Sequence, residues 1–428
     1  MKVESKKIGR GQIELTIEIG IDEYQPFLEK AAQAISQTTK IAGFRPGKAS
    51  LDIVKKQVGE GRIWEEAIEP AVQKTFVQAL DQEKLITVGS PNIDIVKLAP
   101  GNPVVYKATI ALLPAVKLAD YTQLKVKSKE VKVEDKQIEE VLNDLQRRRA
   151  KETLANREAK NGDKVEIDFE VFIDNVPIEN GAQKNFPLVL GEGSFIPGFE
   201  ENLVGLKKDE VKEFKLEFPK DYHQKTVAGK QAEFRVTVRG VYDLDLPKID
   251  DEFAKSLGGF KTVDELKKQV RENLEHEAKH KEDHRVEDEM FDKIIEKSQF
   301  DDIPDILINS ETKKMLDELS QNLAGQGVKF EDYLTHLKKS ENDLLLEFAP
   351  QAVRRVKGAL VTRAVGDQQK VAVDDKEVEE ELKKTLENYG GNADVEKQIN
   401  TPEYRGYVRN ILAARKVTQH LKDTMIEK

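Results

Sequence analysis

The sequence predicts a multidomain α+β protein, with an amino-terminal α+β module, a β-rich middle domain and an extended all-α carboxy-terminal region. A chain of 428 residues is too long for a single core and is expected to form two to four domains. The apolar spacing changes along the chain, from mixed to strand-like over residues 153–245 and then to helical from Pro247 onward. Charged residues make up 35% and aromatic residues 6%, a balance typical of extensive solvated helix surface.

The first module is expected over residues 1–112. Residues 12–19, QIELTIEI, alternate apolar and polar side chains and predict a half-buried strand. Apolar residues recur at helical spacing in residues 24–35, 51–58 and 61–84. Two further strands are expected at residues 92–99 and 104–114.

The decapeptide IAGFRPGKAS predicts an exposed turn between two of these helices. Pro46 fixes φ near the value that the second position of a type II turn needs, and Gly47 accepts the positive φ of the third position. The turn places Phe44 beside two cations, Arg45 and Lys48. An isolated turn of this kind more often carries a half-buried Phe than a binding site, so both interpretations stay open at this point.

A linker and a helix are expected over residues 113–152, with the helix at residues 134–152, and the apolar stripe of that helix needs a partner. The β-rich domain follows over residues 153–245. Its strands are expected at residues 163–173, 186–190, 211–218 and 231–244.

The remaining region, residues 246–428, is expected to be helical. Its helices are predicted at residues 262–298, 304–323, 330–337, 341–366, 374–388 and 402–426.

The composition excludes several classes of function. The net charge of −10 argues against a general nucleic-acid binder, because counterion release needs clustered Lys and Arg. The first 60 residues are the exception, with ten Lys and Arg against eight Asp and Glu. The absence of Cys excludes disulfides, thiolate metal sites and cysteine nucleophiles. No leader and no apolar run near the ~20 residues of a membrane span is visible, so a cytoplasmic protein without membrane partners is expected.

A row of three histidines, His276, His280 and His284, lies along one face of the first predicted helix of the carboxy-terminal region. A divalent metal ion could bridge two of them. One helix supplies no closed coordination shell, so a solvated face without metal is the favoured interpretation. No metal site is predicted here.

The stretch LGEGSFIPGFEENLVGL is the most informative part of the β-rich domain. Gly191 and Gly193 let the chain bend, and Ile196 and Phe199 lie three residues apart at the start of a short helix. On this motif, residues 153–245 resemble the FK506-binding-protein (FKBP) family of peptidyl-prolyl cis-trans isomerases. The resemblance implies catalysis of rotation about X-Pro bonds, whose barrier of about 18–20 kcal/mol comes from amide resonance. Such rotation needs no nucleophile, base or metal, so no cofactor is expected.

The same resemblance implies which residues line the pocket. The candidate catalytic residues are Phe169, Ile178, Glu179, Phe186, Phe195, Ile196, Phe199 and Tyr222. Phe199 takes the position at which many family members have a floor tryptophan. The sequence departs from the family at Glu170 and Val171, where a Thr-Gly pair is usual, and at Asn175, where glycine is usual. Substrate access and rate therefore stay open, as does the alternative that these aromatic residues only form the core of a small barrel.

The order of the three regions, together with GFRPGK, resembles the bacterial trigger factor family over the whole chain. The family's ribosome-docking motif is Gly-Phe-Arg-any-Gly-Lys. It is matched by Gly43, Phe44, Arg45, Gly47 and Lys48. Ser50 departs from the family, in which proline is common there, and could cap the next helix. The carboxy-terminal RNILAARKVTQHL is also typical of the family.

This resemblance implies a chaperone that docks on ribosomal protein and rRNA beside the nascent-chain exit, binds unfolded nascent polypeptides and has isomerase activity. It implies ribosome binding for residues 1–112, packing of residues 113–152 against the carboxy-terminal helices, isomerisation for 153–245 and chaperone arms for 246–428. It also implies roles in protein folding and in cell division, and a location in the cytoplasm. A homodimer off the ribosome stays open.

Two other functions are consistent with these residues. A free-standing FKBP-type isomerase would use the flanking helices to recruit substrates or to form a dimer. An assembly factor for ribosomal proteins would fit the acidic helices. The turn discriminates between the ribosome-associated chaperone and the free-standing isomerase, because an isomerase has no use for a basic, aromatic protrusion more than a hundred residues from its pocket.

Overall fold

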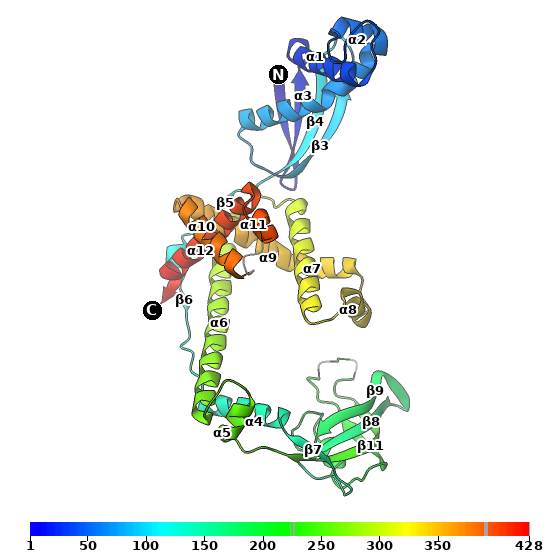
Figure 1. The fold of residues 1–428 in the computed structure, drawn as a ribbon, viewed down its shortest axis with the longest axis vertical. Helices are drawn as coiled ribbons and strands as arrows, with labels where there is room; N and C mark the ends of the chain where they lie inside the picture. Colours follow the sequence, from blue (N-terminus) through cyan, green and yellow to red (C-terminus); the bar gives the residue numbers. More distant parts are fainter. Residues whose placement is uncertain (223, 226, 389–392, 428) are drawn as a thin grey trace. The chain divides into compact units, whose positions relative to one another are not determined.

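The structure, a computed structural model, describes residues 1–222, 224–225, 227–388 and 393–427. The chain forms two compact units. The first combines residues 1–128 with residues 283–428, and the second is residues 129–282. Figure 1 shows helices and strands mixed in the amino-terminal part, strands gathered between residues 151 and 245, and helices over most of the rest. The predicted multidomain α+β fold is confirmed.

The amino-terminal part of the first unit is an antiparallel sheet with helices packed on it. The strand order is β1-β2-β4-β3. The strands are β1 (Lys2–Gly9), β2 (Gln12–Ile19), β3 (Thr87–Lys97) and β4 (Val104–Leu112). The helices are α1 (Ile21–Thr38), α2 (Leu51–Val58) and α3 (Glu60–Glu83). The apolar residues that alternate along β2 and β4 are buried together with residues of all three helices in one core.

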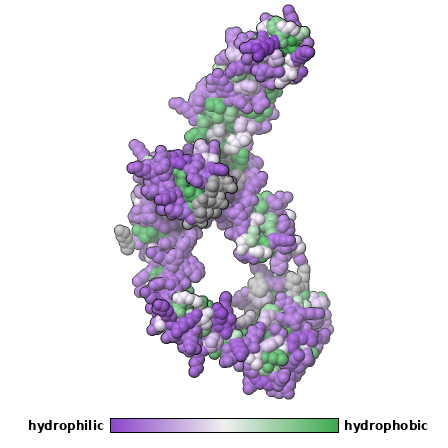
Figure 2. All heavy atoms as spheres, viewed as in Figure 1, coloured by the Kyte–Doolittle hydropathy of each residue, from purple (hydrophilic) through white to green (hydrophobic). Residues whose placement is uncertain are grey.

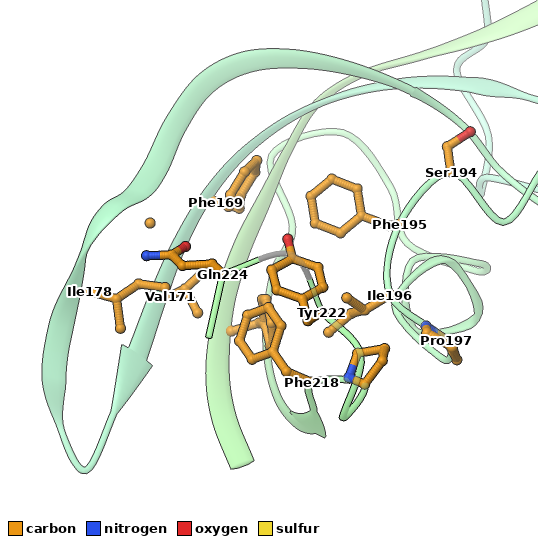
Figure 3. Close-up of a pocket in the computed structure, with 13 residues that line it drawn as sticks. Phe169, Val171, Ile178, Ser194, Phe195, Ile196, Pro197, Phe218, Tyr222 and Gln224 are labelled. Carbon is orange, nitrogen blue, oxygen red and sulfur yellow. The ribbon is translucent and has the colours of Figure 1, made fainter. Parts of the chain in front are cut away.

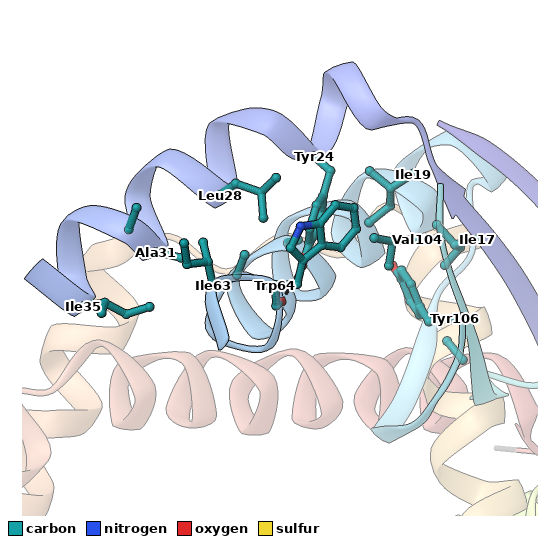
Figure 4. Packing of buried hydrophobic residues seen from close by; sticks show 14 of the residues in the cluster. Ile17, Ile19, Tyr24, Leu28, Ala31, Ile35, Ile63, Trp64, Val104 and Tyr106 are labelled. Carbon is teal, nitrogen blue, oxygen red and sulfur yellow. Dashed lines mark hydrogen bonds between the residues drawn. The ribbon is translucent and has the colours of Figure 1, made fainter. Parts of the chain in front are cut away.

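Two aromatic residues tie the helices of this module together (Figure 4). Tyr24 of α1 and Trp64 of α3 have ring centroids 4.9 Å apart, and the Tyr24 hydroxyl donates a hydrogen bond to the Trp64 carbonyl (2.9 Å). The hydroxyls of Thr75 on α3 and Tyr106 on β4 lie 2.9 Å apart, which joins helix to sheet. These contacts satisfy polar groups that burial would otherwise leave without partners.

The first strand, β1, is not predicted by the sequence pattern. Seven of its eight residues are exposed, so it has no apolar alternation. It forms because its backbone pairs with β2, from Lys2 opposite Glu18 to Lys7 opposite Ile13. Lysines along such an edge disfavour pairing with another chain. Backbone pairing with β2, and not the spacing of its apolar side chains, therefore determines that this segment is a strand.

The carboxy-terminal part of the first unit is helical and includes the end of α6 (Val263–Lys297). The helices that follow are α7 (Asp305–Gly325), α8 (Phe330–Leu337), α9 (Glu341–Gln368), α10 (Asp375–Asn388), α11 (Ala393–Ile399) and α12 (Pro402–Met425). Short pairings join distant segments, β5 (Val116–Lys117) with β12 (Gln299–Phe300) and β6 (Val126–Lys127) with β13 (Ile426–Glu427).

The main core of this helical part gathers segments from four places in the chain. Tyr121 and Val126 pack with Met290 of α6, Val361 of α9 and Leu421 of α12. Burial of such side chains is the dominant favourable term in folding. The segment before the second unit therefore packs with helices that come after it.

Two successive arginines on α9 form ion pairs with two different helices. Arg354 approaches Asp292 on α6 (2.5 Å), whereas Arg355 approaches Glu318 on α7 (2.8 Å). Both arginines are partly exposed, so each pair contributes little to stability, and they serve mainly to orient the helices.

The second unit contains a five-stranded antiparallel sheet. Its order is β10-β11-β8-β9, and β7 pairs with β11. The strands are β7 (Lys151–Leu154), β8 (Lys164–Ile173), β9 (Val176–Val189), β10 (Val211–Glu217) and β11 (Gln231–Asp245). Asp174 and Asn175 join β8 to β9, and both have positive φ, as a two-residue hairpin turn requires. Asn adopts this conformation more readily than most residues, so Asn175 fits where glycine is usual.

A small helical core completes the second unit. Ile138 and Leu142 of α4 (Asp135–Arg148) pack on Phe253 of α5 (Asp251–Ser256) and on Leu266 and Val270 of α6. This is the partner that the apolar stripe of the predicted helix needs. The helix is shorter than expected, because the chain after Arg148 turns into β7 and pairs with β11.

Candidate functional sites: an exposed turn and an aromatic pocket

The tip, residues 41–49, is a tight turn between α1 and α2. The amide of Lys48 donates a hydrogen bond to the carbonyl of Arg45 (3.0 Å). Gly47 has a φ of +77°, which glycine accepts readily. Its amide donates to the carbonyl of Ser36 on α1 (3.0 Å), which fixes the turn to the helix. The turn predicted from the Pro-Gly pair is confirmed.

The tip is anchored at its ends and exposed at its centre. Ile41 and Ala49 are buried in the core of the module, whereas Phe44 is 43% exposed. Arg45 and Lys48 are exposed as well, and neither forms an ion pair with the residues that the structure describes. A fixed turn therefore presents an apolar ring and two cations to solvent.

Ser50 stands at the N-cap position of α2, but its side chain makes no capping hydrogen bond. The amides of Ile53 and Val54 instead bind the Ser50 carbonyl (3.1 and 3.0 Å). The helix start is held by its backbone, so the predicted side-chain cap is wrong.

The β-rich domain holds a cavity of about 500 Å³ (Figure 3). Figure 3 shows Phe169, Phe195, Ile196 and Phe218 arranged around Tyr222. The residues that line the cavity are Phe169, Val171, Ile178, Gly181, Ser194, Phe195, Ile196, Pro197, Phe218, Pro219, Tyr222, Gln224 and Phe234. None of these lining residues is charged at neutral pH, so the described wall is apolar with a few hydrogen-bonding groups.

Two aromatic rings that do not line the cavity, Phe186 and Phe199, contact rings that do. Phe195 lines the cavity, and the fully buried Phe199 stacks on it with ring centroids 4.1 Å apart. Phe186 meets Phe169 edge to face at 5.8 Å. Such pairs are worth about 0.5–1.5 kcal/mol beyond the area that they bury. These contacts therefore help to orient the rings that face the cavity.

The predicted pocket residues separate into three groups. Phe169, Ile178, Phe195, Ile196 and Tyr222 line the cavity. Phe186 and Phe199 do not: the half-buried Phe186 contacts the rings of Phe169 and Phe195, and the fully buried Phe199 stacks on Phe195. The side chain of Glu179 lies outside the described residues.

Sequence reasoning missed three lining residues with large aliphatic or aromatic side chains, Val171, Phe218 and Phe234, and also Gly181, Ser194, Pro197, Pro219 and Gln224. Strand alternation could have found two of them. Val171 lies two residues after Phe169 on β8 and therefore faces the same side of the sheet. Phe234 on β11 is the direct cross-strand partner of Val171.

Glu200, in the short helix η2 (Glu200–Asn202), binds the loop that carries Phe195. Its Oε2 accepts the amides of Gly191 (2.8 Å) and Gly193 (3.0 Å), and its Oε1 accepts those of Ser194 (2.7 Å) and Phe195 (3.2 Å). Burial opposes the charge of this carboxylate, but the four amides outweigh it and hold the pKa of Glu200 below its ordinary value. No pattern in the sequence predicts this role of Glu200.

A second buried carboxylate, Asp163, fixes the chain just before β8. Arg157 donates to both of its oxygens (2.6 and 2.9 Å), and the amide of Lys160 donates to one of them (2.8 Å). Arg157 also pairs with Asp243 on β11. Burial opposes the charge, but the guanidinium and the amide hold the pKa of Asp163 below its ordinary value.

An apolar pocket with a few hydrogen-bonding groups suits rotation about a prolyl peptide bond. The twisted amide has less charge separation than the planar amide, so an environment with little water favours it. The hydroxyl of Tyr222 and the amide of Gln224 can bind polar groups of a peptide in the cavity. No covalent bond forms and no proton has to move. Shape, desolvation and a few hydrogen bonds are therefore the chemistry available here.

Apolar side chains are also exposed away from both sites. On the face shown in Figure 2, hydrophilic residues cover most of the surface and apolar residues form small separate patches. Leu346 in the first turns of α9 is 73% exposed, and Val328 just before α8 and Leu337, the last residue of α8, are exposed too. Helix α8 has no buried residue. This helical region therefore offers several small apolar contacts among charged residues.

The structure shows neither a metal centre nor a spanning segment in the part that it describes. His276, His280 and His284 are exposed on α6, and the rings of the first two lie 6.2 Å apart. No group of three or more His, Asp or Glu in the described ranges has a geometry that could hold a metal ion. Among the described helices, none combines the length and the apolar character needed to cross a bilayer.

Comparison with known proteins matches all three regions of the chain. Residues 1–145 match the family model of the bacterial trigger factor protein, and residues 262–423 match that of its C-terminus. Residues 155–239 match FKBP-type peptidyl-prolyl cis-trans isomerase. The trigger factor of Caldicellulosiruptor saccharolyticus is 34% identical over 399 residues, which cover 92% of this chain and 89% of that protein. The trigger factor of Carboxydothermus hydrogenoformans is 36% identical over 390 residues, which cover 91% of each chain.

Proposed function

This chain belongs to the trigger factor family, and we propose that its tip and its pocket carry the two activities of that family. The protein is a ribosome-associated molecular chaperone that binds nascent polypeptides and assists their folding, and it has peptidyl-prolyl cis-trans isomerase activity. The proposal concerns which residues perform each activity.

Ribosome docking is assigned to Gly43, Phe44, Arg45, Gly47 and Lys48. The observation that carries this assignment is the exposed ring of Phe44 on the same anchored turn as two exposed cations, Arg45 and Lys48. Anchoring lowers the entropy that docking costs, and an aromatic ring is a common centre of binding energy. Arg45 and Lys48 suit carboxylates of a ribosomal protein and phosphates of rRNA.

The test is cosedimentation of the full chain with ribosomes across a salt series. Replacement of Phe44, Arg45 and Lys48 by Ala is expected to leave the fold intact and to abolish cosedimentation. A matched control replaces Lys6, Lys7 and Ile8 by Ala, because these exposed residues of β1 also comprise two cations and one apolar side chain, and Ile8 is 45% exposed. Equal cosedimentation of the tip variant and the control would refute the assignment.

Isomerisation is assigned to the pocket of the β-rich domain. The lining residues Phe169, Ile178, Phe195, Ile196 and Tyr222 are its proposed contact residues, with Glu179 at the family's aspartate position. Phe186 and Phe199 are proposed to orient the lining rings that they contact, Phe169 and Phe195 respectively. An apolar cavity of about 500 Å³ has room for a proline and its neighbours, and it removes the amide from water.

Nascent-chain contacts are assigned to the helical region, residues 246–428, and to the amino-terminal module. The exposed Val328, Leu337 and Leu346 support this, because many weak apolar contacts give a high effective concentration without one strong site. The boundaries 1–112, 113–152 and 153–245 complete the proposed division of roles. Action in the cytoplasm, a homodimer off the ribosome and a link to cell division stay predictions.

A free-standing isomerase is the alternative function. It is less well supported, because the similarity to trigger factors extends over about nine-tenths of the chain and not only over the isomerase domain. Binding of the native chain to vacant ribosomes supports the chaperone, whereas isomerase activity without ribosome binding at any salt concentration supports the alternative.

A further inference from the structure

We propose that Glu200 is a positioning residue of the isomerase, which sets the backbone of residues 191–195 and thereby the place of Phe195 in the pocket. This inference rests on the proposed pocket and extends it, since Glu200 does not line the cavity. It concerns how the pocket is held in shape, not how substrate is bound.

The hydrogen bonds of Glu200 follow the order of the loop. Its Oε2 takes the first pair of amides, Gly191 and Gly193, and its Oε1 takes the second pair, Ser194 and Phe195. Four of five consecutive loop residues thus donate to one side chain, which is only 7% exposed. Without that carboxylate, these donors would have no acceptor in a partly buried place, and the loop would have to rearrange.

Phe195 is fixed from two directions by consecutive residues. Its amide donates to Glu200, and its ring stacks on Phe199 with a centroid distance of 4.1 Å and an interplanar angle of 26°. Next to Phe195 in the chain, Ser194 and Ile196 also line the cavity. A change in the backbone at this point would therefore move three lining residues together.

The charge of Glu200 is balanced by amide dipoles. No Lys, Arg or His of the described chain forms an ion pair with it. Two other carboxylates lie close in the chain to the groups of this network. Glu192, on the loop, pairs with Arg147 (3.0 Å), and Glu201, the residue after Glu200, is exposed. Backbone amides of a bent loop are a known way to stabilise an anionic group.

Glutamine at this position would be diagnostic. Its side chain has nearly the same size, but only one of its two terminal atoms is an acceptor. It can therefore satisfy one pair of amides, while its own NH₂ group faces the other pair. The variant Glu200→Gln changes the hydrogen bonding of the loop and leaves the apolar pocket residues in place.

The test measures the isomerisation of a proline tetrapeptide by the full-length chain, with amide hydrogen exchange on the same samples. Glu200→Gln is expected to lower kcat/KM about tenfold or more, because small displacements of positioned groups are costly. Exchange should become faster at residues 191–195 and stay unchanged in β8. The control is Asp163→Asn, which alters the other buried carboxylate of this domain. The proposal would be overturned if kcat/KM of Glu200→Gln fell only in proportion to the fraction of the protein that is folded, as is expected for the control.

Two further variants make the result decisive. Native activity in Phe195→Ala would overturn the pocket assignment, whereas its loss together with native activity in Glu200→Gln would overturn the role of Glu200 alone. Should Glu200→Gln fail to fold, Glu200→Asp keeps both acceptor oxygens on a shorter side chain. A folded Glu200→Asp with fast exchange at residues 191–195 but native kcat/KM would equally contradict the proposal.

Discussion

Asp163 illustrates how a single buried carboxylate can make one domain sensitive to acid. It receives two bonds from Arg157 and one from the Lys160 amide just before β8, and its pKa is lowered. A carboxyl with a lower pKa in the folded state adds stability at pH values above its unfolded pKa, which is about 3.9 for Asp. That contribution is lost as the pH falls through the folded value.

At the residue scale, Asp163→Asn is expected to destabilise the isomerase domain by about 2 kcal/mol at pH 7, because charge-assisted hydrogen bonds to a buried group are lost. The difference from the native chain should shrink as the pH is lowered from 5 towards 3, because the unfolded carboxyl binds a proton near its pKa of about 3.9, whereas the native carboxylate binds one only at lower pH. Calorimetry of the full chain at several pH values measures this on the transition that the substitution shifts. A difference that stays constant down to pH 3 would contradict the assigned pKa shift.

Single residues also show how far sequence reasoning reaches. The turn at Pro46 and Gly47 was predictable, because its geometry depends on local φ preferences. The roles of Phe199 and Glu200 were not. Phe199 shares its chemistry with the residues that line the cavity, and only packing decides that it lies behind Phe195. Glu200 binds four amides whose directions follow from a loop bend that no periodicity encodes.

At the scale of elements, the pocket loop is joined to a helix outside the sheet. Arg147, near the end of α4, forms an ion pair with Glu192 (3.0 Å), next to the residues that Glu200 binds. Helix α4 in turn packs on α5 and α6. The loop thus has one connection inside the isomerase domain and one to the helical core of the same unit.

Removal of this second connection is expected to have a small effect. Arg147→Ala and Glu192→Ala should each lower kcat/KM by up to about threefold, since partly exposed ion pairs contribute roughly 0–1 kcal/mol. The double variant should match either single variant, because the same interaction is lost. Peptide isomerisation at low and high salt measures this, with Lys136→Ala as a control that removes another ion pair of α4. Additive losses in the double variant would speak against the connection.

The helices were easier to predict than the strands. Helix α8 has the predicted bounds and α9 begins at its predicted residue, because spaced apolar residues and a capping serine mark them. β1 has no such pattern, and β9 extends well before the predicted apolar run, because pairing with β8 carries the strand through residues 176–185. Strands are decided by neighbours that are distant in sequence, which a single sequence does not show.

At the scale of the whole molecule, the two proposed sites belong to different units. The tip lies in the unit formed by residues 1–128 and 283–428, and the pocket lies in residues 129–282. Each unit has its own buried cores. Substitutions at one site should therefore leave the fold of the other unit unchanged.

The two activities are consequently expected to be separable. Phe195→Ala should lower peptide isomerisation tenfold or more and leave ribosome cosedimentation at the native level, whereas the triple alanine tip should do the reverse. Suppression of aggregation of an unfolded client should persist in both variants, because its contacts are spread over many weak positions. Both proteins are compared with the native chain in all three assays. Loss of cosedimentation in Phe195→Ala would show that the sites are not independent.

The pairing of Ile426 with Val126 has a consequence for the synthesis of this protein itself. The helical core that includes Val126 also needs Leu421 and Met425, so about three hundred residues must be made between its first and last contributors. The amino-terminal module, in contrast, has a complete core within its first 112 residues. The amino-terminal module can therefore fold, with its tip in place, while the rest of the chain is still being translated, whereas the helical core can form only once almost the whole chain has been made.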